Sequence, residues 1–527
     1  MGREHLLRVG RRGLITGSAA SLVLAAGPSF GQGAAPVATT KAGKVRGRVV
    51  DGISLFQGVR YGASTAGRRF MPPQPPQPWS GVRHALDFAH QSPQLGAERP
   101  SVYASWANPR PPGEDCLVLN VYTPGLRDGA KRPVMVWFHG GGFTSGSANS
   151  HYADGTRLAH RGDVVVVTVN HRLNAFGYLY LADLAPDLAD SGNVGSLDMV
   201  QALKWVHDNA AEFGGDAGNV TIFGQSGGGG KVSALMAMPA AAGLFHRAIV
   251  QSGSGVKAME PAQAKENTAK VLAALKLGPA DAGKLRTMPM QALSDALPAS
   301  GAGFGPVHDG RSMPRHPFDP DAPPVSKTVP LLVGTAKDET TSLVGGRDES
   351  LFQLTWDQLP ARLAPDLRGM DVAATIAELR RLEPAAKPSD VYFTASTEAR
   401  FRRRAYLQAE RKAAQWKAGG EGAPAFMYLF AWETPVDGGK WKAPHSIDHA
   451  FVFDNVAKSA SMVGAGPDQQ KVADAVSSAW IRFAKTGAPG WAPYDPATRT
   501  TMVFNVESRA VDDPRKATRQ LFEAMPV

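Results

Sequence analysis

The sequence contains a single cysteine, Cys116, in 527 residues, so no disulfide can form within the chain. The lack of further thiols also excludes a zinc site made of cysteines, and we expect Cys116 to be a small buried apolar residue. Stability must therefore come from packing and not from covalent links. With 43% apolar residues, the chain has ample material for a deep core.

Long linkers, repeats and charged blocks are missing as well, which favours one large domain with insertions. The formal net charge of +10 is spread along the sequence, so nothing indicates binding to nucleic acid. The tightest basic cluster, Arg400 with Arg402, Arg403 and Arg404, is interpreted as a solvated helical surface, with contact to an acidic substrate as the alternative. Metal-ligand spacings such as His-Glu-x-x-His are absent, and we expect no metal and no organic cofactor.

The N-terminus carries the only stretch that resembles a targeting segment. Arg8, Arg11 and Arg12 precede the uncharged residues 13–30, whose apolar part is too short to span a bilayer comfortably. This pattern is typical of an export signal, and the paired arginines resemble a twin-arginine signal. We predict that residues 1–33 are cleaved and that residues 34–527 form one periplasmic or secreted domain, away from the membrane. An uncleaved membrane anchor or a disordered tail is the alternative.

Short apolar runs rich in β-branched residues alternate with helical patterns along the rest of the chain. Such nearly continuous apolar runs indicate parallel strands covered on both faces, so we predict an α/β fold with a mostly parallel sheet. The predicted strands are residues 134–138, 164–169, 220–223, 247–251, 329–333 and 426–430. Helices are expected at residues 199–209 and around residues 472–483. Residues 256–297 and 350–411 are predicted to be helical insertions that form a cap.

The most informative local motif is Gly224-Gln225-Ser226-Gly227-Gly228, between the predicted strand 220–223 and a helical pattern. A serine on a tight strand-to-helix turn needs small neighbours, because side chains there would collide. A flexible glycine loop is the plainest alternative. A phosphate-binding loop is less fitting, since it requires a Lys-Ser/Thr pair after the glycines. The strand before the motif and the helix after it favour a nucleophilic serine.

A second glycine motif, His139-Gly140-Gly141-Gly142-Phe143, follows the predicted strand 134–138. Acyl transfer builds negative charge on the carbonyl oxygen of the substrate, and backbone N–H groups about 3 Å away stabilise it. Glycine lets the main chain approach that oxygen without a side chain in the way. The motif is therefore predicted to be an oxyanion loop, against the alternative of a plain glycine turn.

Together with several longer motifs, these two sites resemble the type-B carboxylesterase family, which includes the cholinesterases. The likeness extends from about residue 47 to residue 514. The motifs that carry it are Leu55-Phe56-Gln57-Gly58-Val59-Arg60-Tyr61, Glu114-Asp115-Cys116-Leu117-Val118-Leu119-Asn120-Val121, Asn170-His171-Arg172-Leu173 and Phe213-Gly214-Gly215-Asp216. The resemblance implies an α/β-hydrolase fold and a carboxylic ester hydrolase that acts through an acyl-enzyme intermediate.

The resemblance also implies roles for particular residues. The nucleophile of the family falls on Ser226, and its acid falls on Glu339 in Gly334-Thr335-Ala336-Lys337-Asp338-Glu339. The base falls on His445 in His445-Ser446-Ile447-Asp448. The order of serine, acid and histidine along the chain is the one expected for this fold. Rival groups are Asp338, His449 and His308, which we expect to be structural, with Asp338 hydrogen-bonded to the surrounding loop.

The oxyanion donors of the family fall on Gly141, Gly142 and Gly227. Gly227 stands where the family commonly has alanine, which is expected to keep the donor and loosen the turn slightly. Ser92 stands where many relatives have the cysteine that pairs with the Cys116 position.

Substrate preference is less accessible from the sequence. From their proximity to the motifs, four aromatic residues are predicted to form the rim of the pocket: Phe143, Phe304, Phe393 and Trp441. The expected partner is a small-molecule ester, while the sequence does not indicate an oligomeric state. An amidase or acyltransferase with the same triad is the alternative, and a non-catalytic binding protein of this fold is a remote one.

Overall fold

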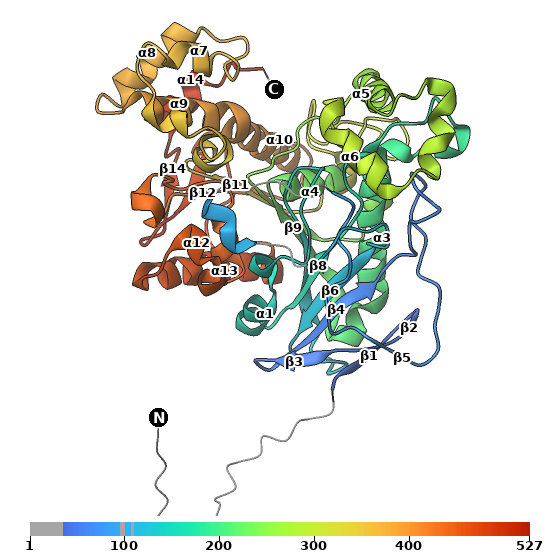
Figure 1. Ribbon diagram of the computed structural model, residues 1–527. Coiled ribbons are helices and arrows are strands. Elements are labelled where there is room, and N and C mark those ends of the chain that lie inside the picture. Colours follow the sequence, from blue (N-terminus) through green and yellow to red (C-terminus); the bar gives the residue numbers. More distant parts are fainter. Residues whose placement is uncertain (1–34, 95–100, 107–109, 527) are drawn as a thin grey trace, which may run out of the picture. The chain divides into compact units, whose positions relative to one another are not determined.

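A computed structural model of the chain describes residues 35–94, 101–106 and 110–526 (Figure 1). The predicted export signal, residues 1–33, lies outside these residues and stays a prediction. The chain divides into residues 1–35 and residues 36–527, and only the second unit is described below. In the described part of the chain, no helix combines the length and the apolar character that crossing a membrane requires.

The second unit is built around a sheet of 11 strands in the order β14-β13-β12-β11-β10-β9-β7-β8-β6-β4-β3. From β8 to β13 neighbouring strands are parallel, and the strands at both edges are antiparallel. The strands are β3 (Arg48–Val50), β4 (Ile53–Arg60), β6 (Val118–Thr123), β7 (Arg132–Phe138), β8 (Val165–Val169), β9 (Gly215–Gln225), β10 (Arg247–Gln251), β11 (Leu331–Ala336), β12 (Ala425–Phe430), β13 (Thr500–Phe504) and β14 (Arg509–Asp512). All the predicted strands are confirmed, and β13 adds one parallel strand that the sequence analysis did not include.

A smaller sheet is formed by strands that lie before and after β3 and β4 in the chain. Its strands are β1 (Val37–Thr40), β2 (Gly43–Arg46) and β5 (Val82–His84), in the order β1-β2-β5.

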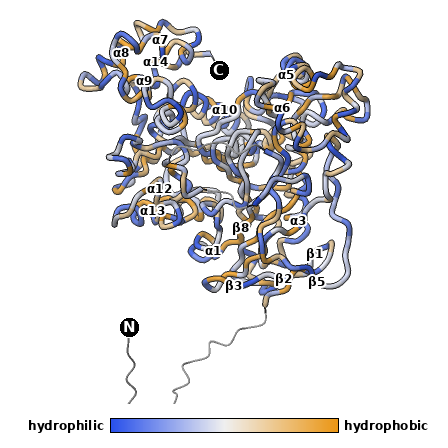
Figure 2. The backbone as a smooth tube through the Cα atoms, in the orientation of Figure 1, coloured by the Kyte–Doolittle hydropathy of each residue, from blue (hydrophilic) through white to orange (hydrophobic). Residues whose placement is uncertain are grey.

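Helices cover both faces of the large sheet, and two apolar cores result. Val136 and Phe138 of β7 face one core, with α3 (Val194–Asn209), α4 (Gly227–Ala237) and α10 (Arg403–Gly419). Trp137, between them, faces the other core, with α1 (Thr156–Gly162), α11 (Asp448–Val452) and α13 (Pro467–Thr486). This alternation follows from the two-residue period of a strand. Along helices such as α8 and α13, hydrophobic and hydrophilic residues alternate every few positions, as expected for helices with one buried face (Figure 2).

The helices of the two predicted insertions pack in two smaller apolar clusters, to which residues outside the insertions, such as Phe176 and Phe522, also contribute. In the first lie α5 (Pro261–Ala274) and α6 (Met290–Ser300), and in the second α7 (Leu359–Leu363), α8 (Val372–Leu382) and α9 (Pro388–Thr397). The second insertion ends earlier than predicted, because α10 packs on β11 and β12 through Ala405 and Ala409. Short helices α2 (Asn174–Tyr178), α12 (Ala460–Val463) and α14 (Lys516–Leu521) complete the set. Cys116 is fully buried, as predicted.

Candidate active site

Ser226 lies on the sharp turn between β9 and α4, with a φ of 57°. Residues other than glycine rarely adopt a positive φ, so contacts with the surrounding structure must stabilise this backbone conformation. The N–H of Ser226 donates to the carbonyl of Gln251 at 2.7 Å. A Cβ at Gly228 would lie 2.1 Å from the Phe138 oxygen, and one at Gly253 would lie 1.8 Å from the Ser226 oxygen. Glycine is therefore required at both positions for the turn to close.

Glu339 and His445 meet beside this turn. Glu339 follows β11 and His445 follows β12, and both side chains are buried. The Nδ1–H of His445 donates to Glu339 Oε2 at 2.5 Å, while Glu339 Oε1 accepts from the Ala336 N–H at 2.8 Å. With its Nδ1 protonated, the imidazole keeps a lone pair on Nε2, the atom that a general base uses.

Gln225 fixes the orientation of this histidine from the serine side. Its amide nitrogen donates to His445 Nε2 at 3.3 Å, and its amide oxygen accepts from the Ser446 hydroxyl at 2.8 Å. The same oxygen accepts from His449 Nε2 at 3.3 Å. These bonds make Nε2 of His445 the acceptor nitrogen, and its donor is the residue that directly precedes Ser226.

Ser226 and His445 open onto one pocket of about 430 Å³. Its described lining consists of Tyr103, Trp106, Gly140, Gly141, Gly142, Thr144, Ser145, Gly146, Ser150, Tyr152, Gln225, Ser226, Ser342, Leu343, Arg347, His445, Ser446 and His449. Gly141 and Gly142 have φ values of 90° and 61°, which favour glycine. Gly227 is the first residue of α4, where backbone N–H groups have no partner within the helix.

The glycine loop and the turn are in direct backbone contact. A Cβ at Gly227 would lie 2.2 Å from the Gly142 oxygen and 2.4 Å from its Cα. The predicted slight loosening of the turn is therefore wrong, because the missing side chain lets the loop approach closely. On the other side of the loop, the Nζ of Lys231 donates to the His139 carbonyl at 2.8 Å. Burial without an acidic partner lowers the pKa of this lysine well below its usual value.

The basic cluster at residues 400–404 is a correction to the sequence analysis, since Arg402 is fully buried. It forms an ion pair with Glu398 at 2.5 Å and donates to the carbonyls of Ala336 and Lys337 at 2.9 and 2.7 Å. The ring of Phe401 lies 5.1 Å from that of His445. The π-helical turn Glu398–Arg402 thus supports the segment that carries Glu339 and packs against His445.

The four rim residues assigned by proximity are absent from the described lining of the pocket. Phe393 and Trp441 are buried in apolar clusters, and Phe304 packs against the cluster of α5 and α6. Phe143 turns away to pack edge-on against Tyr178. The position of these residues in the sequence predicts that their backbone lies near the site, but it does not predict where each side chain points.

The aromatic residues that do line the pocket were missed. They are Tyr103, Trp106 and Tyr152, from two short 3₁₀ turns, Ser101–Trp106 and His151–Ala153. No motif surrounds them in the sequence, so only the fold could place them. The hydroxyl of Tyr103 donates to the His445 carbonyl at 3.1 Å and so ties this wall to the histidine.

The rival acid and bases differ from Glu339 and His445 in their surroundings. Asp338 Oδ2 accepts from the Ala443 N–H at 3.3 Å, which confirms the predicted loop contact. His449 lines the pocket, but burial lowers its pKa well below the usual value and Gln225 takes its Nε2–H. His308 is not among the described residues that line the pocket.

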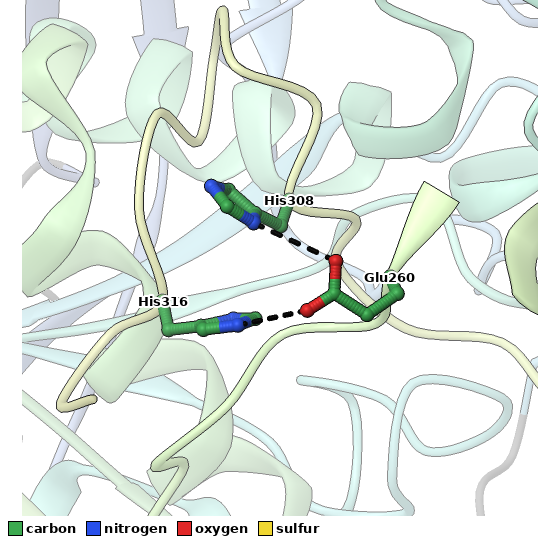
Figure 3. Close-up of side chains that lie close together, drawn as sticks. All are labelled: Glu260, His308 and His316. Atoms are coloured by element: carbon green, nitrogen blue, oxygen red, sulfur yellow. Dashed lines mark ion pairs between the residues drawn. The ribbon is translucent and has the colours of Figure 1, made fainter. Parts of the chain in front are cut away.

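His308 belongs to a separate cluster with Glu260 and His316, at the start of α5 (Figure 3). His316 Nε2 lies 3.0 Å from Glu260 Oε1, and His308 Nδ1 lies 3.7 Å from Glu260 Oε2. Because His316 Nδ1 accepts the Ala258 N–H at 3.2 Å, its Nε2 carries the hydrogen and donates to the carboxylate. A ring in that state offers no lone pair to a metal at Nε2. We interpret the cluster as a polar tether between α5 and the loop after it.

The comparisons with known proteins agree with one another. A model of the carboxylesterase family matches residues 34–522. The chain is 34% identical to the para-nitrobenzyl esterase of Bacillus subtilis (strain 168), over 92% of this chain and 98% of that protein. It is 33% identical to the phenmedipham hydrolase of Pseudarthrobacter oxydans, over 86% and 90% of the two chains. The solved structure of a Geobacillus stearothermophilus carboxylesterase matches with a TM-score of 0.80 and 35% identity, over 92% of this chain and 99% of that one.

Proposed function

This chain belongs to the carboxylesterase family and is a carboxylic ester hydrolase of the α/β-hydrolase fold, and we propose that it works through Ser226, His445 and Glu339. The observation that supports this assignment is the 2.5 Å contact between His445 and Glu339 in the pocket that also exposes Ser226. It leaves the lone pair on His445 Nε2, which lies 3.3 Å from the amide of Gln225, the neighbour of Ser226, and a general base needs such a lone pair.

In the first half of the reaction, the Oγ of Ser226 attacks the ester carbonyl carbon while its proton passes to His445 Nε2. The carbonyl oxygen becomes negatively charged, and the N–H groups of Gly141, Gly142 and Gly227 donate to it. The C–O bond of the ester then breaks, and the proton on His445 goes to the departing alkoxide. The products of this half are the free alcohol and an acyl group on Ser226.

In the second half, His445 accepts a proton from water as the water oxygen attacks the acyl carbon. The same amides stabilise the second oxyanion, and its collapse returns the proton from His445 to Ser226 Oγ. A carboxylic acid leaves. Throughout, the buried carboxylate of Glu339 fixes the ring through Nδ1–H and stabilises the imidazolium that forms twice.

The close approach of the glycine loop leads to a prediction for Gly227→Ala. The added methyl group would overlap the Gly142 backbone, so the glycine loop must move away from the turn. A misplaced oxyanion donor is expected to lower kcat by roughly 10- to 100-fold. Steady-state kinetics on a short-chain aryl ester measure this, with the unfolding temperature as a check on folding. An unchanged kcat would mean that the loop accommodates alanine and that the contact does not set the oxyanion geometry.

The choice between ester and amide chemistry can be measured directly. We expect a carboxylic ester to be cleaved roughly 100-fold faster or more than the amide of the same acid, because an amine leaves only after full protonation. The measurement compares kcat/KM for matched esters and amides of several acyl sizes. Amide turnover at the rate of the ester would instead support the amidase alternative.

A further inference from the structure

The walls of the pocket differ in character. One wall is aromatic, with the Trp106 ring centroid 4.4 Å from that of Tyr152 and 5.1 Å from that of Tyr103. The segment that follows Glu339 along the chain adjoins this wall, since the Tyr103 hydroxyl lies 2.7 Å from that of Ser342, and it also contributes Leu343 and Arg347. An apolar or aromatic group of a substrate can therefore pack on the aromatic wall, and the guanidinium of Arg347 belongs to the same pocket.

Arg347 is the only arginine or lysine among the described lining residues, and none of those residues is aspartate or glutamate. The one acidic group nearby in the mechanism, Glu339, is fully buried behind His445. The described lining thus carries one permanent positive charge and no negative charge. A site of this kind attracts anions and repels cations.

The carboxylates next to Arg347 in the sequence are occupied by other cations. Asp348 pairs with Arg362, and Glu349 pairs with Lys440 at 3.1 Å. In the part of the chain that the structure describes, no side chain forms an ion pair or hydrogen bond with the Arg347 guanidinium. Arg347 is exposed, so its five N–H donors are available to a ligand in the pocket.

From this arrangement we propose that the pocket takes esters that carry a second, ionised carboxylate, and that Arg347 binds that carboxylate. The proposal rests on the proposed function, because it names the substrate class of the same site. A guanidinium matches a carboxylate with two parallel N–H···O bonds, which a lysine or a neutral amide cannot reproduce. The aromatic wall packs against the body of the substrate between the two carbonyl groups.

The test uses two esters of the same shape and different charge. Methyl 4-carboxybenzoate is anionic, and methyl 4-carbamoylbenzoate replaces its carboxylate with a neutral amide. A second pair, monoethyl adipate and ethyl 5-carbamoylpentanoate, lets the charged group reach further. For each substrate, kcat/KM of the parent is divided by that of Arg347→Gln, so that the intrinsic reactivity of the ester cancels.

We expect the parent-to-variant ratio to be roughly tenfold larger for a carboxylate ester than for its carboxamide, since the charged bond is strong but partly exposed to water. Arg347→Lys is expected to recover part of this difference. Sodium chloride at about 0.5 M should shrink it, because salt screens an exposed pair. Arg381→Gln, which removes the same charge from the exposed face of α8, is the matched control and should leave the difference unchanged.

The proposal would be overturned if, in both pairs, the parent-to-variant ratio of kcat/KM were the same for the carboxylate ester and its carboxamide. This holds whether Arg347→Gln hydrolyses both esters more slowly or neither. So would a parent enzyme that hydrolyses the carboxamide esters and a neutral aryl acetate but neither carboxylate ester. In those cases ester hydrolysis itself is observed and the proposed function stands. Only a parent that cleaves none of these esters, including the neutral aryl acetate, would contradict the proposed function as well.

Discussion

Replacing Ser226 with alanine is expected to lower kcat for the best ester by roughly 10⁴-fold or more, with little change in stability. In the proposed mechanism the hydroxyl supplies the atom that forms the acyl-enzyme bond, and alanine has no atom to replace it. The oxyanion amides and the pocket remain, so a small residual rate over water is expected.

The measurement has two arms. Kinetics give the loss of rate, and a fluorophosphonate probe followed by peptide mass spectrometry locates the nucleophile. The probe should label the parent once, at Ser226, and should not label Ser226→Ala. Ser477→Ala removes a buried hydroxyl from α13, where it bonds the Ala473 carbonyl, and serves as the matched control. Retention of the parent rate by Ser226→Ala, or labelling at another residue, would refute the assignment.

The second large effect is expected at Arg402, a residue that touches neither the serine nor the substrate pocket. Arg402→Met should lower the free energy of unfolding by about 3 kcal/mol, because removing one member of a buried ion pair leaves the other uncompensated. Glu398 would keep only its contact with Arg515, at 3.2 Å. The carbonyls of Ala336 and Lys337 would lose their donors at the same time.

Urea unfolding of the parent and the variant measures this change. The double variant Glu398→Gln with Arg402→Met should regain part of the stability, since it removes the unpaired charge. Arg381→Met, at an exposed arginine of α8, should change stability by less than about 0.5 kcal/mol. An Arg402→Met protein as stable as the parent would show that the buried pair does not support this segment. Since the same bonds hold the turn before Glu339, kcat of the folded variant is also expected to fall.

These two residues illustrate how far local sequence information extends. Ser226 was predicted to be the nucleophile because its motif lies in a continuous strand, turn and helix, although the contacts that require two of its glycines are made with the distant residues Phe138 and Gly142. Arg402 was interpreted as solvated because a cluster of arginines on one helix is usually exposed. Its true neighbours, Glu398 apart, are carbonyls more than sixty residues earlier in the chain, at the end of β11.

The sequence by itself determined the chemistry: the strands, the two glycine motifs, the family, and which serine, glutamate and histidine are proposed to act. Each of those was predicted from a motif or a pattern of residues that lie close together in the chain. The tertiary structure alone decided which walls surround the serine, that Arg347 is the cation there, that Gly227 meets Gly142, and that Arg402 lies beneath Glu339. Those outcomes arise from packing between distant segments, and the free energy of such packing depends on side-chain directions that no local pattern records.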